Sequence, residues 1–114
     1  MSMVAPIENR TEIDGVVTSR TPHESVDRWD VLEVRVADTA PVEGYPDLLS
    51  RQVSEQPSGT LTIATDRSHL PDGDLDGWHF HGQAMLAGPG VIRAVTDASG
   101  APGVELFPPP SPQL

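Results

Sequence analysis

The sequence contains no cysteine and no lysine, and both absences restrict its chemistry. Without a thiol the chain cannot form a disulfide, a thiolate metal site or a cysteine nucleophile. All seven basic residues are arginines spread singly along the chain, against 17 aspartates and glutamates. The formal net charge of −10 disfavours nucleic acids and anionic membranes, because binding to either needs clustered cations. A positively charged protein surface or a cation is the better partner on electrostatic grounds.

Long apolar runs are also missing. No stretch approaches the roughly 20 apolar residues of a membrane-spanning helix. Residues 1–10 have neither the basic start nor the apolar centre of a secretion signal. We therefore expect a cytoplasmic protein without a membrane partner.

Glycine and proline are frequent instead, with 10 and 12 residues among 114. This composition disfavours long helices and favours turn-rich β-structure in a single domain. Apolar and polar residues alternate most clearly over residues 29–37 and 60–65, which predicts two strands with one buried face. A further strand is expected at residues 12–19, with a bulge or bend at Gly15, and a hairpin at residues 78–96.

One short helix is expected at residues 45–53, where Asp47 suits the positive end of a helix. Residues 1–11 show no periodicity and are expected to form a flexible arm. Residues 101–114 contain five prolines, which predicts an extended tail. The remaining residues, 12–100, form the predicted domain.

These elements predict a mainly β fold, a small antiparallel five-stranded barrel or sandwich with one short helix and a proline-rich C-terminal tail. Barrels are favoured because closure removes the exposed strand edges that promote aggregation. In size and strand count the pattern resembles an OB-type barrel. It departs from that barrel in its helix, which is expected after the second strand, whereas an OB barrel usually has one between the third and fourth.

The densest cluster of metal-ligand residues is an acidic turn. Asp72, Asp74 and Asp76, followed by Gly77, match the start of a calcium-binding loop. The twelfth position is Gln83 rather than a bidentate glutamate, and the flanks are predicted strands rather than helices, so a complete EF-hand is excluded. A weak calcium-binding turn and a simple solvated turn both stay open.

His79 and His81 are the second candidate, because residues two apart on a strand point to the same face. Two imidazoles could begin a zinc-type site, completed by His69 or by the acidic turn. They could equally lie on the solvent-exposed face of a half-buried strand. A pH-dependent binding face is a third interpretation, because imidazoles change charge between about pH 5 and 8.

Evidence for catalysis is sparse. The sequence lacks a Gly-x-Ser-x-Gly elbow and a phosphate-binding loop. Acid–base chemistry by a histidine and an aspartate stays open, but a small core leaves little room for a deep substrate pocket. We expect no catalytic residues and no cofactor beyond a possible divalent metal.

Trp29 lies on the face of its predicted strand opposite Leu32 and Val34. It is expected either to pack at the barrel end or to be an exposed interface anchor.

Three functional hypotheses follow. The first is a non-catalytic binding module that associates with a protein partner or with itself, using its acidic surface, Trp29 and His81 with the neighbouring His79. The second is a metal-binding domain whose structural or hydrolytic site combines the two histidines with the aspartates of residues 72–76. The third is an OB-type oligonucleotide binder, which the net charge disfavours unless the arginines gather on one face.

Overall fold

The computed structural model describes residues 8–55, 59–88, 91–95 and 103–109. In this part of the chain the elements are β1 (Thr11–Pro22), β2 (Trp29–Pro41), α1 (Ser50–Glu55), β3 (Thr60–Asp66), η1 (Arg67–His69), β4 (His79–Gly88), β5 (Val91–Ala94) and β6 (Val104–Phe107). No helix within these ranges is long and apolar enough to cross a membrane.

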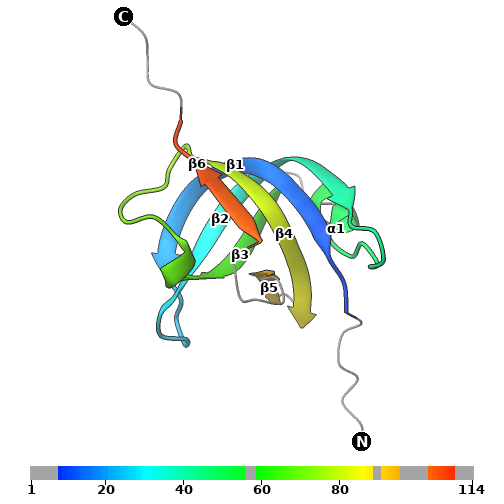
Figure 1. Cartoon of the computed structure of the whole chain (residues 1–114), viewed down its shortest axis with the longest axis horizontal. Coiled ribbons are helices and arrows are strands. Elements are labelled where there is room, and N and C mark those ends of the chain that lie inside the picture. Colours follow the sequence, from blue (N-terminus) through cyan, green and yellow to red (C-terminus); the bar gives the residue numbers. More distant parts are fainter. Residues whose placement is uncertain (1–7, 56–58, 89–90, 96–102, 110–114) are drawn as a thin grey trace, which may run out of the picture.

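The strands form one sheet that closes on itself (Figure 1). Their order is β1-β2-β3-β5-β4-β6, and an additional pairing of β1 with β4 completes a five-stranded barrel to which β6 is added. All pairings are antiparallel except that of β3 with β5, where Ala64 lies opposite Arg93. The prediction of a mainly β barrel with one short helix is confirmed.

The core consists of the inward-facing residues of each strand, as expected from side-chain alternation. Its fully or almost fully buried members on strands include Ile13, Val17, Leu32, Val34, Leu61, Ile63, Phe80 and Ala84. Three further buried leucines come from the connections between strands: Leu49 just before α1, and Leu70 and Leu75 between β3 and β4. The connections therefore contribute to the same core as the strands.

Gly15 lies at the predicted irregularity of β1, since the register with β2 shifts between Asp14 and Gly15. A Cβ atom at this position would lie 2.3 Å from the carbonyl oxygen of Arg35. Because that neighbour is backbone, it cannot turn aside as a flexible side chain would. The close approach of β1 and β2 thus requires glycine.

We expect Gly15→Ala to lower the free energy of unfolding by about 2 kcal/mol, because the added methyl group forces the two strands apart. Urea denaturation measures this value. Thr62→Ala, an exposed position on β3, is the control and should change stability by less than about 0.5 kcal/mol. Superimposable curves for Gly15→Ala and the wild type would contradict the close approach.

The helix begins later than predicted, at Ser50 rather than near residue 45. The reason is Asp47, whose Oδ1 accepts the backbone N–H groups of Leu49 and Ser50 and so caps the chain before it turns helical. The same oxygen accepts the hydroxyl of Thr11 at 2.7 Å. This carboxylate therefore ties the start of the helix to β1.

Contacts with the barrel also begin earlier in the chain than predicted. Asn9, within the expected N-terminal arm, is fully buried. Its Nδ2 donates to the carbonyl of Leu86 at 3.0 Å, and its Oδ1 accepts the N–H of Leu86 at 2.9 Å. The side-chain amide of Asn9 thus forms the same pair of hydrogen bonds with Leu86 of β4 that the backbone of a neighbouring strand would form. Residues 1–7 of the expected arm lie outside the described residues.

At the other end, β6 falls within the segment predicted to be an extended tail. It pairs with β4 from Val104 opposite Gly82 to Phe107 opposite His79. A Cβ atom at Gly82 would lie 2.7 Å from the Cα of Val104, so glycine permits this contact. Residues 101, 102 and 110–114 of the expected tail lie outside the described part of the chain.

Candidate functional site

His79 and His81 lie on the outer surface of the barrel, against the carboxylates of the neighbouring strand β1. The Nε2 of His79 is 2.6 Å from Oδ1 of Asp14, and the Nε2 of His81 is 3.6 Å from Oε1 of Glu12. This arrangement follows from the register, in which Asp14 lies opposite His81. The four side chains are between 42 and 46% exposed, so they remain accessible to a partner.

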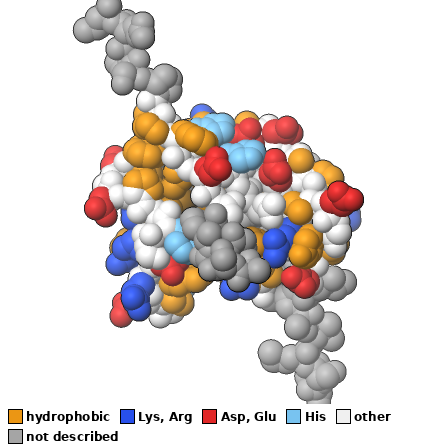
Figure 2. Space-filling model, viewed as in Figure 1, with side chains coloured by type: hydrophobic (Ala, Val, Ile, Leu, Met, Phe, Trp, Pro, Cys, Tyr) orange, Lys and Arg blue, Asp and Glu red, His pale blue; other side chains and the backbone are white. Residues whose placement is uncertain are grey.

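Strand β6 extends this surface on the other side of β4. Glu105 lies opposite His81 and Phe107 opposite His79, with the His79 and Phe107 ring centroids 6.1 Å apart. Phe107 is 48% exposed, which is unusual for a large apolar side chain in this barrel. Figure 2 shows adjacent histidine side chains bordered by carboxylates on this side. We call these six residues the histidine face: Glu12, Asp14, His79, His81, Glu105 and Phe107.

The acidic turn, which was predicted to supply metal ligands, is held in place by hydrogen bonds within the protein. Asp72, Asp74 and Asp76 are all exposed, and Oδ1 of Asp74 accepts the N–H of Asp76 at 2.9 Å. Arg20 holds the turn from β1 by donating to the carbonyl of Gly73 at 2.9 Å. Within the described ranges, no group of three or more histidine, aspartate or glutamate side chains is placed to hold a metal ion. The metal hypothesis therefore rests on the sequence pattern alone.

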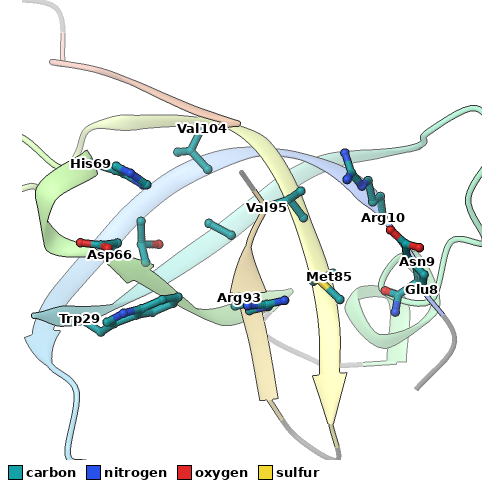
Figure 3. A pocket seen from close by; sticks show the side chains of 12 residues that line it. Glu8, Asn9, Arg10, Trp29, Asp66, His69, Met85, Arg93, Val95 and Val104 are labelled. Carbon is teal, nitrogen blue, oxygen red and sulfur yellow. The ribbon is translucent and has the colours of Figure 1, made fainter. Parts of the chain in front are cut away.

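Trp29 lines a cavity in the barrel wall (Figure 3). Within the described residues, strands β3 and β5 share one residue pair, Ala64 with Arg93. Near the end of β3 and beside β5 there is a space of about 550 Å³, which we call the wall cavity. Figure 3 shows Trp29, Asp66 and His69 on one side of it, Glu8, Arg10 and Met85 on the other, and Arg93 between them.

Thr65 is the most unusual polar group of the wall cavity. It is 2% exposed, and its Oγ1 has no hydrogen-bond partner among the described residues. Sequence reasoning missed it, although the alternation offered a signal: Thr65 shares the inward face of β3 with Leu61 and Ile63. A hydroxyl at an inward position requires a hydrogen-bond partner that the strand pairing here does not supply.

Asp66, the next residue, lies at the rim. Its Oδ1 accepts both the N–H and the hydroxyl of Ser68 at 2.9 Å. The hydrogen bond from the backbone of Ser68, followed by that from its side chain, lowers the pKa of Asp66 below its ordinary value. The rim therefore carries an ionised acceptor at neutral pH.

Two arginines also line the wall cavity. Arg10 packs over the ring of Tyr45, with its guanidinium carbon 4.5 Å from the ring centroid, and its Nη1 donates to Oε1 of Gln83 at 3.4 Å. Arg93 comes from β5. Glu8 and Asp66 line the same space, so the formal charges of these four side chains cancel.

Trp29 and His81 were expected to act in one interface. They line separate hollows: Trp29 the wall cavity, and His81 two smaller ones near Glu12. The described residues thus present two distinct candidate surfaces.

Comparison of the chain with protein-family models, with curated proteins and with solved structures gave no match. Its function must therefore be argued from the histidine face and the wall cavity.

Proposed function

We propose that this chain is a non-catalytic cytoplasmic module that binds a basic segment of a protein partner through the histidine face. The observation that carries the proposal is the half-exposed row in which His79 and His81 lie beside Asp14 and Glu12. Carboxylates held at a flat surface can accept hydrogen bonds from arginine and lysine side chains. Phe107 adds an exposed ring that can contact a cation or an aliphatic stem.

Charge favours a partner over self-association. Two copies of a chain with a formal charge of −10 repel each other, and this repulsion is strongest where acidic surfaces meet. A basic partner gains from the same field, both in its association rate and in its orientation. Self-association is therefore an alternative outcome of the test below.

We expect the double variant Glu12→Gln/Glu105→Gln to bind a fluorescent octa-arginine peptide about tenfold more weakly than the wild type. The two carboxylates flank His81, and two exposed ion pairs worth about 0.7 kcal/mol each give that factor. Fluorescence anisotropy at about 50 mM salt, where screening is weak, measures the affinity.

The matched control is Asp72→Asn/Asp74→Asn, which removes the same charge from an exposed turn. We expect its affinity to stay within about twofold of the wild type, because the turn is not part of the histidine face. Equal weakening by both double variants would show that only the net charge attracts the peptide. If light scattering shows dimers that form as the protein concentration rises, the histidine face binds a second copy of the chain instead of a basic partner.

The strand order favours a second candidate, an OB-type barrel that binds single-stranded nucleic acid. Strands β4-β1-β2-β3 are neighbours in that order, which is a Greek key, and the OB fold is a five-stranded, partly open Greek-key barrel. The single residue pair between β3 and β5 supports the partly open form. Trp29 would be a stacking platform, but only two of seven arginines line its cavity.

A labelled deoxythymidine oligonucleotide at low salt tests this second candidate. Binding that weakens as salt rises and is lost in Trp29→Leu would support it, because phosphate contacts are salt-dependent and base stacking needs the indole. Absence of binding at about 20 mM salt would remove it.

A further inference from the structure

The wall cavity has the dimensions and the location of a site for a small molecule. Its volume of about 550 Å³ falls within the range of roughly 300 to 1,000 Å³ that is typical of ligand pockets. It lies where the barrel wall is least complete, since β3 and β5 share one residue pair. Side chains from strands β2 to β6, from η1 and from the residues just before β1 surround it.

The floor of the cavity carries the strongest indication that something binds there. Thr65 is 98% buried, lines the cavity, and its Oγ1 has no partner in the described part of the chain. Buried hydroxyls are almost always hydrogen-bonded, because leaving one unpaired is unfavourable. A ligand with a donor or acceptor at its edge would satisfy this group.

Two planar side chains line the cavity. Figure 3 shows the indole of Trp29 at one side of the cavity and the guanidinium of Arg93 near its middle, and both are planar groups that can stack on an aromatic system. Val95 and Val104, 7% and 8% exposed, also line the cavity and add apolar surface. The space is thus lined by planar and apolar side chains as well as by polar groups.

The polar points lie near one another along the chain and in space. Thr65 and Asp66 are neighbours at the end of β3, and His69 follows within η1. Asp66 offers an acceptor, since no hydrogen bond to its Oδ2 is formed within the described ranges. A ring that presents N–H donors and ring acceptors along one edge would match this combination.

We propose that the wall cavity binds a small planar heteroaromatic molecule of the nucleobase type. In this arrangement Trp29 stacks on the ring, while Thr65 and Asp66 bond to its edge. A polyanionic ligand fits poorly, because the charges of Glu8 and Asp66 offset those of Arg10 and Arg93. A purely aliphatic ligand would leave the Thr65 hydroxyl unpaired. This site is separate from the histidine face and does not depend on the proposed partner binding.

The test is a titration with adenosine, guanosine, cytidine and uridine, followed by ligand-observed NMR and by tryptophan fluorescence in a Trp78→Phe background. We expect at least one nucleoside to bind with a dissociation constant below about 1 mM. Thr65→Val removes the hydroxyl at nearly constant volume and should weaken binding about tenfold, the usual effect of losing one buried hydrogen bond. Trp29→Leu should weaken it by at least as much, because the stacking surface is lost.

Controls separate binding from folding and from the histidine face. Thr65→Val should melt at the same or a higher temperature than the wild type, because the hydroxyl is unpaired in the free protein. Thr62→Val, exposed on the same strand, and Glu12→Gln/Glu105→Gln should bind the nucleoside like the wild type. The proposal is overturned if no nucleoside binds at about 10 mM, or if Thr65→Val and Trp29→Leu retain full affinity.

Discussion

Replacing Asp30 by alanine is expected to lower the free energy of unfolding by about 3 kcal/mol at pH 7. Asp30 is 4% exposed on β2 and binds two arginines. Its Oδ2 accepts from Nε of Arg20 at 2.7 Å, and its Oδ1 lies 2.9 Å from Nη2 of Arg67. Truncation leaves Arg20, whose side chain is only 14% exposed, without its counter-ion. Arg20 also donates to the carbonyl of Pro71, just before the acidic turn. The substitution therefore also weakens the attachment of the β3–β4 connection to β1.

The pH dependence of this effect follows from the pKa of Asp30. Burial alone raises the pKa, but the hydrogen bonds from Arg67 and Arg20 outweigh it and leave the pKa below its ordinary value of 3.8. A carboxyl group with a lower pKa in the folded state stabilises the protein above its unfolded-state pKa. That contribution is lost as the pH falls through the folded-state value. The difference between wild type and Asp30→Ala should therefore shrink below about pH 4.

Urea denaturation at pH 7, 5, 4 and 3 checks both statements about Asp30. Asp27→Ala is the matched control, because Asp27 is an exposed carboxylate three positions earlier, and it should change stability by less than about 0.5 kcal/mol. Equal losses for Asp30→Ala and Asp27→Ala would contradict the buried ion pair. A loss that is as large at pH 3 as at pH 7 would contradict the lowered pKa.

Replacing Phe80 by alanine is expected to cost about 4 kcal/mol. Phe80 is the largest fully buried side chain among the described residues. It lies on β4 and pairs with Gly15 of β1 on one side and with Leu106 of β6 on the other. Its removal opens a cavity where three strands meet, which strand pairing prevents from collapsing. Urea denaturation at neutral pH measures the loss.

Phe107→Ala is the control for Phe80, because the same side chain is removed from a surface position that is 48% exposed. It should cost less than about 1 kcal/mol. If Phe80→Ala does not fold, Phe80→Leu should still unfold at lower urea than Phe107→Leu, since the smaller side chain leaves part of the space empty. Similar midpoints for the two leucine variants would contradict the placement of the core.

Local patterns were sufficient to predict most strands of the barrel. The alternation around Leu32 and Leu61 reflects one buried and one exposed face, and Gly15 interrupts its strand where the register shifts. Strand β6 was missed because four residues beside several prolines carry too little periodicity. The late start of α1 depends on Asp47, whose hydrogen bond to Thr11 is a tertiary contact that local propensity does not contain.

The candidate sites were less predictable, because each depends on which strands are neighbours. The sequence indicated that His79 and His81 share a face, but not that β1 would place Asp14 and Glu12 against them. The wall cavity depends on β3 and β5 sharing one residue pair, a property of barrel closure. Of the residues in the wall cavity, Thr65 could have been identified from the sequence, because it is a polar residue at an inward-facing position of a predicted strand.

The most direct test of partner binding is an amide NMR titration of the ¹⁵N-labelled protein with an octa-arginine peptide. The histidine face predicts that the largest saturable shifts occur at residues 79–81 and at Glu105, with small shifts at residues 72–76. Perturbations should fall as salt rises, because the contacts are exposed ion pairs. Shifts of equal size in the acidic turn and the histidine face, or none at the histidine face, would contradict the proposed function.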